Sequence, residues 1–306
     1  MSWIELRLDT TAEGIDWVRT LLATADYSDD LYITAIEPTT APYPFTVRLY
    51  LPSISALQQQ VIANLLAPLQ RTGLTTALQA TLVPQKPKIS EASGQRIGRF
   101  VVLSPDSSTQ LQPDEIPLRL EKTLTFGSGM HPTTIVSLRL LDRHLRPEMS
   151  ALDLGSGSGI LSVAMAKLGA QVVAIDNDPI AVQATQSAVL RNGVEAQVTV
   201  RGGSLGRGSE LGHWMSGNLN TDVASIAPIA AFDLIVANIL ARVHVALAPD
   251  YHRALRQSAT QPSLLITAGF TIDSADEVNA ALSEAGFVAA DRELFNEWIA
   301  LAHRLV

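Results

Sequence analysis

The feature that most constrains the fold of this chain is the segment 151–159, ALDLGSGSG, where three alternating glycines follow a short apolar run. The apolar run is typical of a buried parallel strand and is interrupted only by Asp153. Residues 160–168 then show helical apolar spacing, and a second strand pattern at 171–175 ends on Asp176. Strand, glycine-rich turn, helix, strand and terminal acid predict one βαβ unit of a nucleotide-binding sheet.

The spacing of the glycines indicates which nucleotide this turn would hold. A dinucleotide-binding turn reads Gly-x-Gly-x-x-Gly and holds a pyrophosphate, whereas this turn reads Gly155-x-Gly157-x-Gly159. The carboxylate of Asp153 would repel a pyrophosphate but would suit the ammonium and sulfonium groups of S-adenosylmethionine (AdoMet). Asp176 can accept hydrogen bonds from ribose hydroxyls. The turn therefore favours a methyl-transfer domain, and an NAD-binding turn or a turn without a ligand are the alternatives.

Composition excludes several classes of protein. The net charge of −8 over 306 residues argues against a large nucleic-acid surface, which needs clustered Lys and Arg, but it suits a basic protein as substrate. The absence of cysteine excludes disulfides and fits a cytoplasmic enzyme. Residues 1–10 lack a signal-peptide pattern, and the most apolar stretch, 223–249, is too polar to span a membrane. We expect no metal site, no membrane segment and a monomer.

The first 83 residues predict a small α+β domain. Strand and helix patterns alternate as β-α-β-β-α-β, the ferredoxin-like arrangement, over 3–8, 11–23, 31–36, 45–51, 53–66 and 74–83. This region carries no candidate catalytic residues, so a binding module or a structural appendage are both open. Residues 84–95 predict a linker. We expect the methyltransferase domain at 96–306, with connecting strands (96–103 and 118–125) within 96–125 and the catalytic core at 126–306.

A second informative segment is FGSGMHPTT at 126–134. Its two glycines predict a flexible loop, and Pro132 stands where the first residue of a helix should be. One interpretation is an ordinary helix start that is capped by His131. The other places the loop over the bound nucleotide, with the hydroxyls of Thr133 and Thr134 and the free amides of the first turn as polar partners.

A third segment is FDLIVANILA at 232–241, which predicts a central strand with Asn238 at its carboxyl end. Open α/β sheets bind their ligands at this end. The side-chain carbonyl of Asn238 could accept a hydrogen bond from an incoming amine, although a turn-capping Asn is an alternative. The preceding residues, 202–231, lack periodicity and predict a long loop or insertion. In that region Ser204 follows the third strand, 197–201, where an adenine-contacting acid often lies.

The remaining segments complete the alternation of strands and helices. They are a helix at 179–191, a helix at 242–257, a strand at 264–267, a helix at 272–285 and strands at 286–289 and 297–303. The last two strands are adjacent in sequence and predict a terminal antiparallel hairpin.

Together the motifs resemble those of the PrmA-type methyltransferases of ribosomal protein L11. The residues that carry the resemblance are FGSGMHPTT at 126–134, LDLGSGSGIL at 152–161, AIDNDP at 174–179 and VANILA at 236–241, with SWIEL at 2–6 and EWI at 297–299 near the ends. The resemblance is detailed from Phe126 onward and only architectural before Pro84. The chain departs from the family in three places: Ser128 and Met130 stand where threonines are common, 84–98 has no Trp, and the 202–231 segment is longer.

The resemblance implies a seven-stranded, Rossmann-like AdoMet-dependent domain that methylates amino groups of ribosomal protein L11. The amino groups would be lysine side chains, with the N-terminal amine as a further candidate. It also implies that the ferredoxin-like domain docks the substrate and that a linker lets this domain swing. Carried over by motif, Thr134, Gly155, Asp176 and Asn238 would contact AdoMet, and Asn238 would also orient the nucleophile. Reasoning from the turn itself adds Asp153 and Gly157 to the cofactor site.

Other functions remain open at this point. One alternative is a methyltransferase of the same fold that acts on a lysine or glutamine of a different protein, or on a nucleic-acid base. The residues after Asn238 lack the prolines and the aromatic side chain that favour amide or base nitrogens, and aromatic residues make up only 5% of the chain. A non-catalytic binding module would predict loss of Asp153, Asp176 or Asn238, and all three are present.

Overall fold

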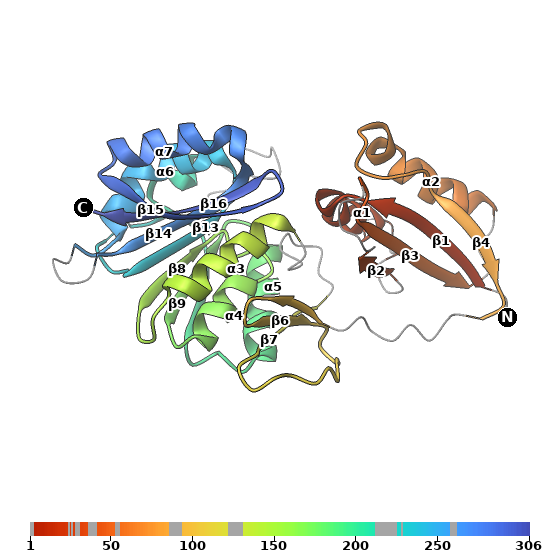
Figure 1. Cartoon of the computed structure of the whole chain (residues 1–306), viewed down its shortest axis with the longest axis horizontal. Coiled ribbons are helices and arrows are strands. Elements are labelled where there is room, and N and C mark those ends of the chain that lie inside the picture. Colours follow the sequence, from red (N-terminus) through yellow and green to blue (C-terminus); the bar gives the residue numbers. More distant parts are fainter. Residues whose placement is uncertain are drawn as a thin grey trace. The chain divides into compact units, whose positions relative to one another are not determined.

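The computed structural model describes most of the chain, in two compact units that divide between residues 93 and 94 (Figure 1). The described residues are 3–23, 25, 27, 31–35, 42–52, 56–85, 94–121, 131–211, 225–227, 229–257 and 262–306. The division falls inside the segment 84–95 that the sequence predicts to be a linker. Each unit has its own hydrophobic core.

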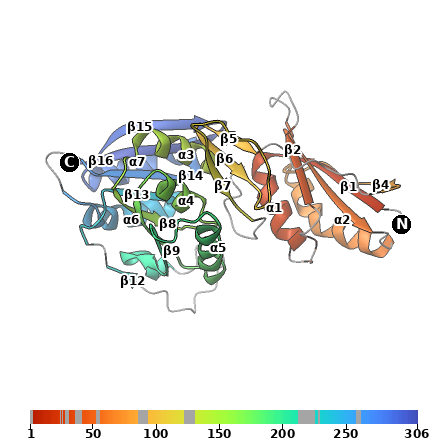
Figure 2. The same ribbon diagram turned by 90° about the horizontal axis from the view of Figure 1, so that it is seen from below.

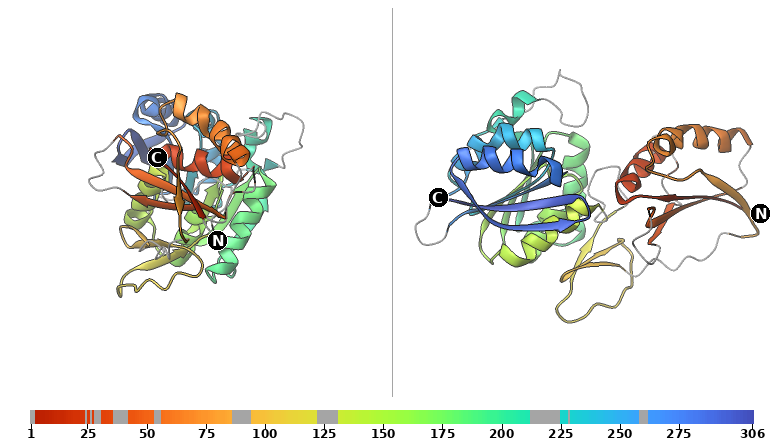
Figure 3. Two further views of the ribbon diagram at one scale, coloured as in Figure 1. Left: turned by 90° about the vertical axis from the view of Figure 1, so that its right-hand side faces the viewer. Right: turned by 45° about the horizontal axis from the view of Figure 1, so that its top comes forward.

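The first unit is an antiparallel sheet with strand order β2-β3-β1-β4 and two helices. Its elements are β1 (Trp3–Thr10), α1 (Ala12–Ala23), β2 (Leu31–Ala35), β3 (Phe45–Pro52), α2 (Ala56–Arg71) and β4 (Gln79–Val83), in the predicted order of types. Alternate residues of β1 are buried, and Leu6 and Leu8 pack in one cluster with Val18 of α1 and Ile62 of α2. The two helices therefore cover the same face of the sheet (Figure 3).

The two largest differences from the predicted boundaries in this unit are five residues each. Helix α2 continues beyond its predicted end at Leu66 to Arg71, because Leu69 is also buried in the core. Strand β4 begins at Gln79 rather than at Leu74, since the preceding residues meet β1 only through an isolated bridge at Thr75.

The second unit opens with a three-stranded sheet of β5 (Gln95–Ile97), β6 (Phe100–Leu103) and β7 (Ile116–Arg119). The single strand predicted at 96–103 is instead a hairpin of β5 and β6, with a turn at Gly98. The strand predicted at 118–125 begins earlier, at Ile116, because Pro117 is tolerated on an edge strand. Phe100 and Leu118 are buried in the same cluster as the central helices, so this sheet packs against the main domain as expected.

The centre of the second unit is a seven-stranded sheet with the order β10-β9-β8-β13-β14-β16-β15. Its strands are β8 (Ser150–Leu154), β9 (Gln171–Asp176), β10 (Val198–Gly202), β13 (Leu234–Asn238), β14 (Leu264–Thr271), β15 (Phe287–Phe295) and β16 (Trp298–Leu305). The first five strands in this order run parallel, and β16 runs antiparallel to both of its neighbours. The predicted terminal hairpin is thus confirmed.

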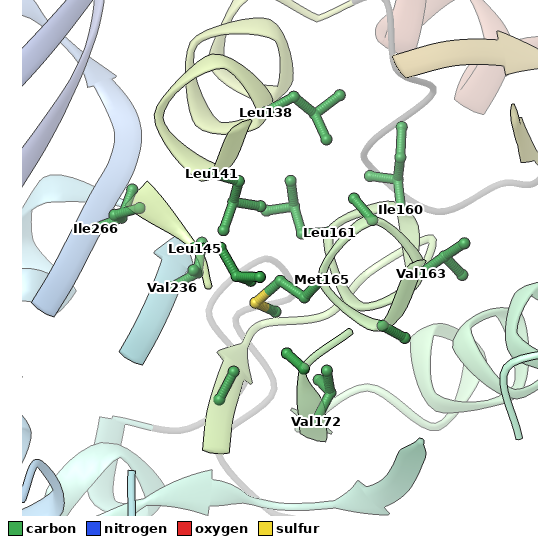
Figure 4. Packing of buried hydrophobic residues seen from close by; sticks show 14 of the residues in the cluster. Leu138, Leu141, Leu145, Ile160, Leu161, Val163, Met165, Val172, Val236 and Ile266 are labelled. Carbon is green, nitrogen blue, oxygen red and sulfur yellow. The ribbon is translucent and has the colours of Figure 1, made fainter. Parts of the chain in front are cut away.

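Helices cover both faces of this sheet (Figures 1 and 2). One face packs against α3 (Pro132–His144), α4 (Ile160–Lys167) and α5 (Pro179–Arg191), and the other against α6 (Ala241–Ala254) and α7 (Ala275–Glu284). Figure 4 shows the first of these cores, where Leu138 and Leu141 of α3 and Leu161 and Met165 of α4 gather with Val236 of β13. Burial on both faces explains why the central strands are almost entirely apolar.

The region that the sequence predicts to be one long loop, 202–231, is partly ordered. It holds the end of β10, then β11 (Ser204–Leu205), a 3₁₀ helix η1 (Gly206–Leu211) and β12 (Ser225–Ile226), with β11 parallel to β12. The buried carboxylate of Asp250 on α6 anchors η1 by accepting the Arg207 amide at 3.2 Å. Elements this short leave no periodic pattern in a sequence. Residues 212–224 and 228 lie outside the described residues.

Two absences hold for the described part of the chain. None of its helices is long and apolar enough to cross a membrane. Within the same residues there is no group of three or more His, Asp or Glu side chains that could hold a metal ion.

Candidate functional site

Five of the predicted site residues, namely Asp153, Gly155, Gly157, Asp176 and Asn238, lie at or next to the carboxyl ends of three adjacent parallel strands. Leu154 of β8 pairs with Ile175 of β9 on one side and with Ala237 of β13 on the other. The next residue of each strand, namely Gly155, Asp176 and Asn238, therefore lies at the same level of the sheet. With neighbouring strands about 4.8 Å apart, this row spans about 10 Å. The chain also changes direction here, since β9 lies on one side of β8 and β13 on the other, and open sheets bind ligands at such a switch point.

The glycine turn after β8 is held in one shape by its neighbours. The amide of Gly157 donates to Asp176 Oδ2 at 2.9 Å, and the hydroxyl of Thr185 on α5 donates to the Gly157 carbonyl at 3.1 Å. Ser156 Oγ lies 2.9 Å from the same Thr185 hydroxyl. Gly159 has φ of 80°, and a Cβ there would lie 2.9 Å from the Thr185 backbone. The turn is therefore preorganised by β9 and α5.

Asp176 ends β9 as predicted, and its carboxylate is almost completely buried. Oδ2 accepts the Gly157 amide, and Oδ1 accepts the amide of Asp178 at 3.0 Å. Burial raises the pKa of this carboxyl, and the two amide hydrogen bonds oppose that rise. Because each carboxylate oxygen can accept more than one hydrogen bond, Asp176 keeps capacity for further donors.

Asp153 is fully buried in β8, one residue before the end of the strand. Its Oδ2 accepts a 2.5 Å hydrogen bond from the hydroxyl of Ser162 on α4, while its Oδ1 is buried without a partner among the described residues. Burial raises the pKa of Asp153 to about 7, and the charge of Asp176 adds to that rise. A cation beside Oδ1 would favour the ionised carboxylate.

Thr134 and Asn238 present two more buried acceptors. Neither Thr134 Oγ1 nor Asn238 Oδ1 has a hydrogen-bond partner within the residues that the structure describes. Asn238 is the last residue of β13, as predicted, and Thr134 lies in the first turn of α3. Helix α3 packs over β13 and β14 on the face that also carries α4.

The start of α3 matches the first interpretation of this segment, a helix start that is capped by His131. The imidazole of His131 caps this helix, because its Nδ1 accepts the Thr133 amide at 3.3 Å and lies 2.7 Å from the Thr133 hydroxyl. The Thr134 amide donates to the His131 carbonyl at 3.0 Å. The amides of Thr133 and Thr134 are therefore not free for a ligand, and the Thr133 hydroxyl is already engaged. Residues 126–130, the predicted loop over the nucleotide, lie outside the described residues.

Ser204 lies next to the same edge of the sheet. It is fully buried in β11, and its hydroxyl has no partner among the described residues. The neighbouring amide of Gly203 donates to the Asp176 carbonyl at 2.8 Å. Ser204 therefore directly follows Gly203, whose amide contacts the last residue of β9.

Two residues that shape the site were missed in the sequence, Ser162 and Thr185. Both are fully buried hydroxyl residues on helices that face the glycine turn or the strand before it. The signal that could have found them is a hydroxyl residue on the apolar face of a helix, where it needs a partner.

Comparison with known proteins identifies the family. A sequence model of the family described as ribosomal protein L11 methyltransferase (PrmA) matches residues 90–305. This chain belongs to the PrmA family. It is 37% identical over 330 residues to a ribosomal protein L11 methyltransferase of Chloroflexus aurantiacus, covering 99% of this chain and 98% of that protein. The corresponding protein of Herpetosiphon aurantiacus is 33% identical over 326 residues, covering 99% of both chains.

A solved structure supports the family relationship. The crystal structure of a ribosomal protein L11 methylase from Lactobacillus delbrueckii subsp. bulgaricus superposes with a TM-score of 0.53 at 25% identity. That match covers 68% of this chain and 96% of the other. Because the Chloroflexus relative aligns over nearly the whole chain, the similarity to PrmA proteins also extends into the residues before Pro84, beyond the architectural likeness expected there.

Proposed function

We propose that this PrmA-family protein transfers methyl groups from AdoMet to amino groups of ribosomal protein L11. The observation that carries the proposal is the fully buried carboxylate of Asp153, whose Oδ1 has no partner among the described residues at the switch point of the sheet. A buried acid with an unmet acceptor fits a cationic ligand. The curated relatives that match almost the whole chain carry the name ribosomal protein L11 methyltransferase, which supports the choice of substrate.

The residues at the edge of the sheet fit AdoMet part by part. Asp153 Oδ1 would accept from the ammonium group or lie near the sulfonium. Asp176 would accept from the ribose hydroxyls, and the backbone of Gly155 and Gly157 would let the cofactor approach closely. Thr134 Oγ1 is the remaining polar contact from α3. When bound, AdoMet supplies a methyl group that is already activated by the positive sulfur.

Asn238 would act on the incoming amine. Its buried Oδ1 can accept a hydrogen bond from an amine N–H and thereby aim the nitrogen lone pair at the methyl group. Asn238 has no titratable group in the physiological range, so it does not act as the base. An amine that enters a dry site beside a positive charge has a lowered pKa, which favours its neutral, nucleophilic form.

The division of the chain suggests separate roles for its two units. We propose a ferredoxin-like substrate-recognition domain at 1–83, a linker at 84–95 and a seven-stranded, Rossmann-like methyltransferase domain at 96–306. The β-α-β-β-α-β order and the sheet order β2-β3-β1-β4 support the first assignment. The parallel strands with helices on both faces support the second. We also propose that the enzyme is cytoplasmic and monomeric and does not bind nucleic acid directly, and the net charge of −8 supports the last of these points.

Chemical blocking of the amines tests whether amino groups of L11 are the methyl acceptors. Purified ribosomal protein L11 is acetylated on its amines, and transfer from methyl-labelled AdoMet is compared with untreated L11. We expect label only in the untreated protein, since acetylation converts each amine into an amide, whose nitrogen lone pair is delocalised and no longer nucleophilic. Equal labelling of both samples would contradict N-methylation of amines and would point to a glutamine or another side chain.

A further inference from the structure

His244 is a buried imidazole that the proposed mechanism does not use. It lies in the first turn of α6 and is fully buried. Its Nε2 lies 2.9 Å from the carbonyl oxygen of Ala268, and its Nδ1 lies 3.1 Å from the hydroxyl of Tyr251. Because a carbonyl can only accept, Nε2 carries the proton and Nδ1 accepts from Tyr251. The contacts thus hold His244 neutral in one tautomer, and burial also lowers its pKa, to about 4.

The Ala268 carbonyl that His244 contacts also accepts a hydrogen bond from the residue that follows Asn238 at the end of β13. Ala268 O accepts the amide of Ile239 at 3.0 Å, and Ile239 directly follows Asn238. The next residue, Gly269, has φ of 96°, and a Cβ there would lie 2.3 Å from the Ile239 carbonyl oxygen. The backbone of β14 therefore lies directly against the residue after Asn238, where the pairing of β14 with β16 also shifts register.

The backbone and ring of His244 make two further contacts near the same segment. Its amide donates to the carbonyl of Leu240 at 3.3 Å, and its ring lies edge-on to Phe270, with 5.4 Å between ring centroids. One residue thus connects helix α6, the end of β13 and the irregular part of β14. None of these contacts involves β8 or β9, which carry Asp153 and Asp176.

We infer that His244 is a positioning residue for Asn238. By donating to the Ala268 carbonyl, it fixes the acceptor of the Ile239 amide and so sets the backbone that aims Asn238 Oδ1. The catalytic consequence rests on the proposed function, whereas the effect on the Ile239 amide does not. Loss of the imidazole donor should therefore lower turnover more than AdoMet binding.

Three variants test this inference in the full-length protein. His244→Phe keeps a ring but removes the donor, His244→Gln keeps an N–H donor, and Tyr251→Phe removes the hydroxyl that donates to Nδ1 and helps to hold the ring in place. We expect His244→Phe to lower kcat with L11 about tenfold while AdoMet Kd changes less than about twofold, and His244→Gln to restore most of the activity. By NMR, the Ile239 amide should exchange about tenfold faster in His244→Phe than in the parent protein.

The outcomes separate this inference from the proposed function. Unchanged Ile239 exchange in His244→Phe, or equal losses of kcat and AdoMet affinity, would overturn the positioning role. If the parent protein does not methylate L11, the proposed function fails, and the exchange measurement still decides the role of His244. If His244→Phe does not fold, slower Ile239 exchange in His244→Gln than in Tyr251→Phe supports the inference, and the reverse order overturns it.

Discussion

Asp153 combines complete burial with a group that is normally charged at neutral pH. Burial raises its pKa to about 7 in the folded protein, against the ordinary value of 3.8 for a free aspartate carboxyl. Between these values the folded state binds more protons than the unfolded state, so stability falls as pH rises. Without a cation to compensate it, the ionised carboxylate therefore destabilises the fold above pH 7.

This predicts a pH-dependent stability for the protein without AdoMet. The full displacement of the Asp153 pKa corresponds to about 4 kcal/mol of unfolding free energy, lost between about pH 4 and pH 7. Asp153→Asn removes the titrating group and should flatten this part of the profile. Urea unfolding of both proteins at several pH values measures the difference, and parallel profiles would contradict a raised pKa at Asp153.

Replacement of Asn238 by Ala should mainly affect turnover, and replacement of Asp176 by Ala should mainly affect AdoMet binding. Asn238→Ala should lower kcat about 100-fold, because no side-chain oxygen then orients the amine, while AdoMet binding falls much less. Asp176→Ala should mainly weaken AdoMet binding, by about tenfold or more, because charge-assisted hydrogen bonds are lost. Calorimetric titration with AdoMet and steady-state kinetics on L11 separate the two effects. Equal losses of binding and turnover in Asn238→Ala would rule out the role in orienting the amine.

At the scale of elements, the glycine turn and helix α5 form one structural unit. The positive φ of Gly159 and its closeness to Thr185 fix how near the helix approaches the turn. Gly193, just after the end of α5, offers a matched control, because it also has positive φ (64°) but no atom within 4 Å of an added Cβ. A side chain introduced at either glycine would therefore meet the same backbone strain, but only at Gly159 would it also clash with neighbouring atoms.

We expect the two glycine variants to differ in stability. Gly193→Ala should cost about 1 kcal/mol, which is the penalty for a side chain in the left-handed region. Gly159→Ala should cost about 2–4 kcal/mol, because the new Cβ also displaces the Thr185 backbone, and it should weaken AdoMet binding. Thermal unfolding of both variants measures the loss of stability, and AdoMet titration measures the loss of cofactor affinity. Equal destabilisation would show that α5 can move away from the turn without cost.

Most elements of the second unit could be predicted because they carry strong sequence motifs. The elements that were missed or misplaced have only weak local patterns. The strands that end on Asp176 and Asn238 were predicted because dense apolar runs end at a polar residue. Strand β7 was misplaced because Pro117 is allowed only at a sheet edge, and edges are not visible in sequence. The short elements within 202–211 leave no periodicity at all.

Only part of the candidate site could be predicted from the sequence, because some of its residues belong to local motifs and others do not. Glycine spacing and the acids beside it are local, so they could be found in sequence. Ser162, Thr185 and His244 act through contacts with residues 9 to 29 positions away, which only the fold brings together. The amides of Thr133 and Thr134 looked free because the capping role of His131 was open.

At the scale of the whole molecule, the two units have separate cores. The cluster around Leu6, Val18 and Ile62 contains only residues of the first unit, and the two clusters of the second contain none of them. Each unit can therefore bury its own apolar surface, as independently folding domains do.

This separation predicts the behaviour of the second unit alone. A protein of residues 94–306 should fold and bind AdoMet with nearly the affinity of the full chain, because every candidate cofactor residue lies within it. It should methylate L11 at least about tenfold more slowly at low L11 concentration, since it lacks the proposed docking domain. Undiminished activity on L11 would contradict a docking role for residues 1–83.

The central claim is tested most directly by the intact mass of ribosomal protein L11 after incubation with this enzyme and AdoMet. L11 from the same organism is used, with Asn238→Ala enzyme as the control. We predict mass gains in steps of about 14 Da, one CH₂ each, that are far smaller with the control. An L11 mass that does not change, although the enzyme binds AdoMet, would contradict the claim and assign the methyl group to another acceptor.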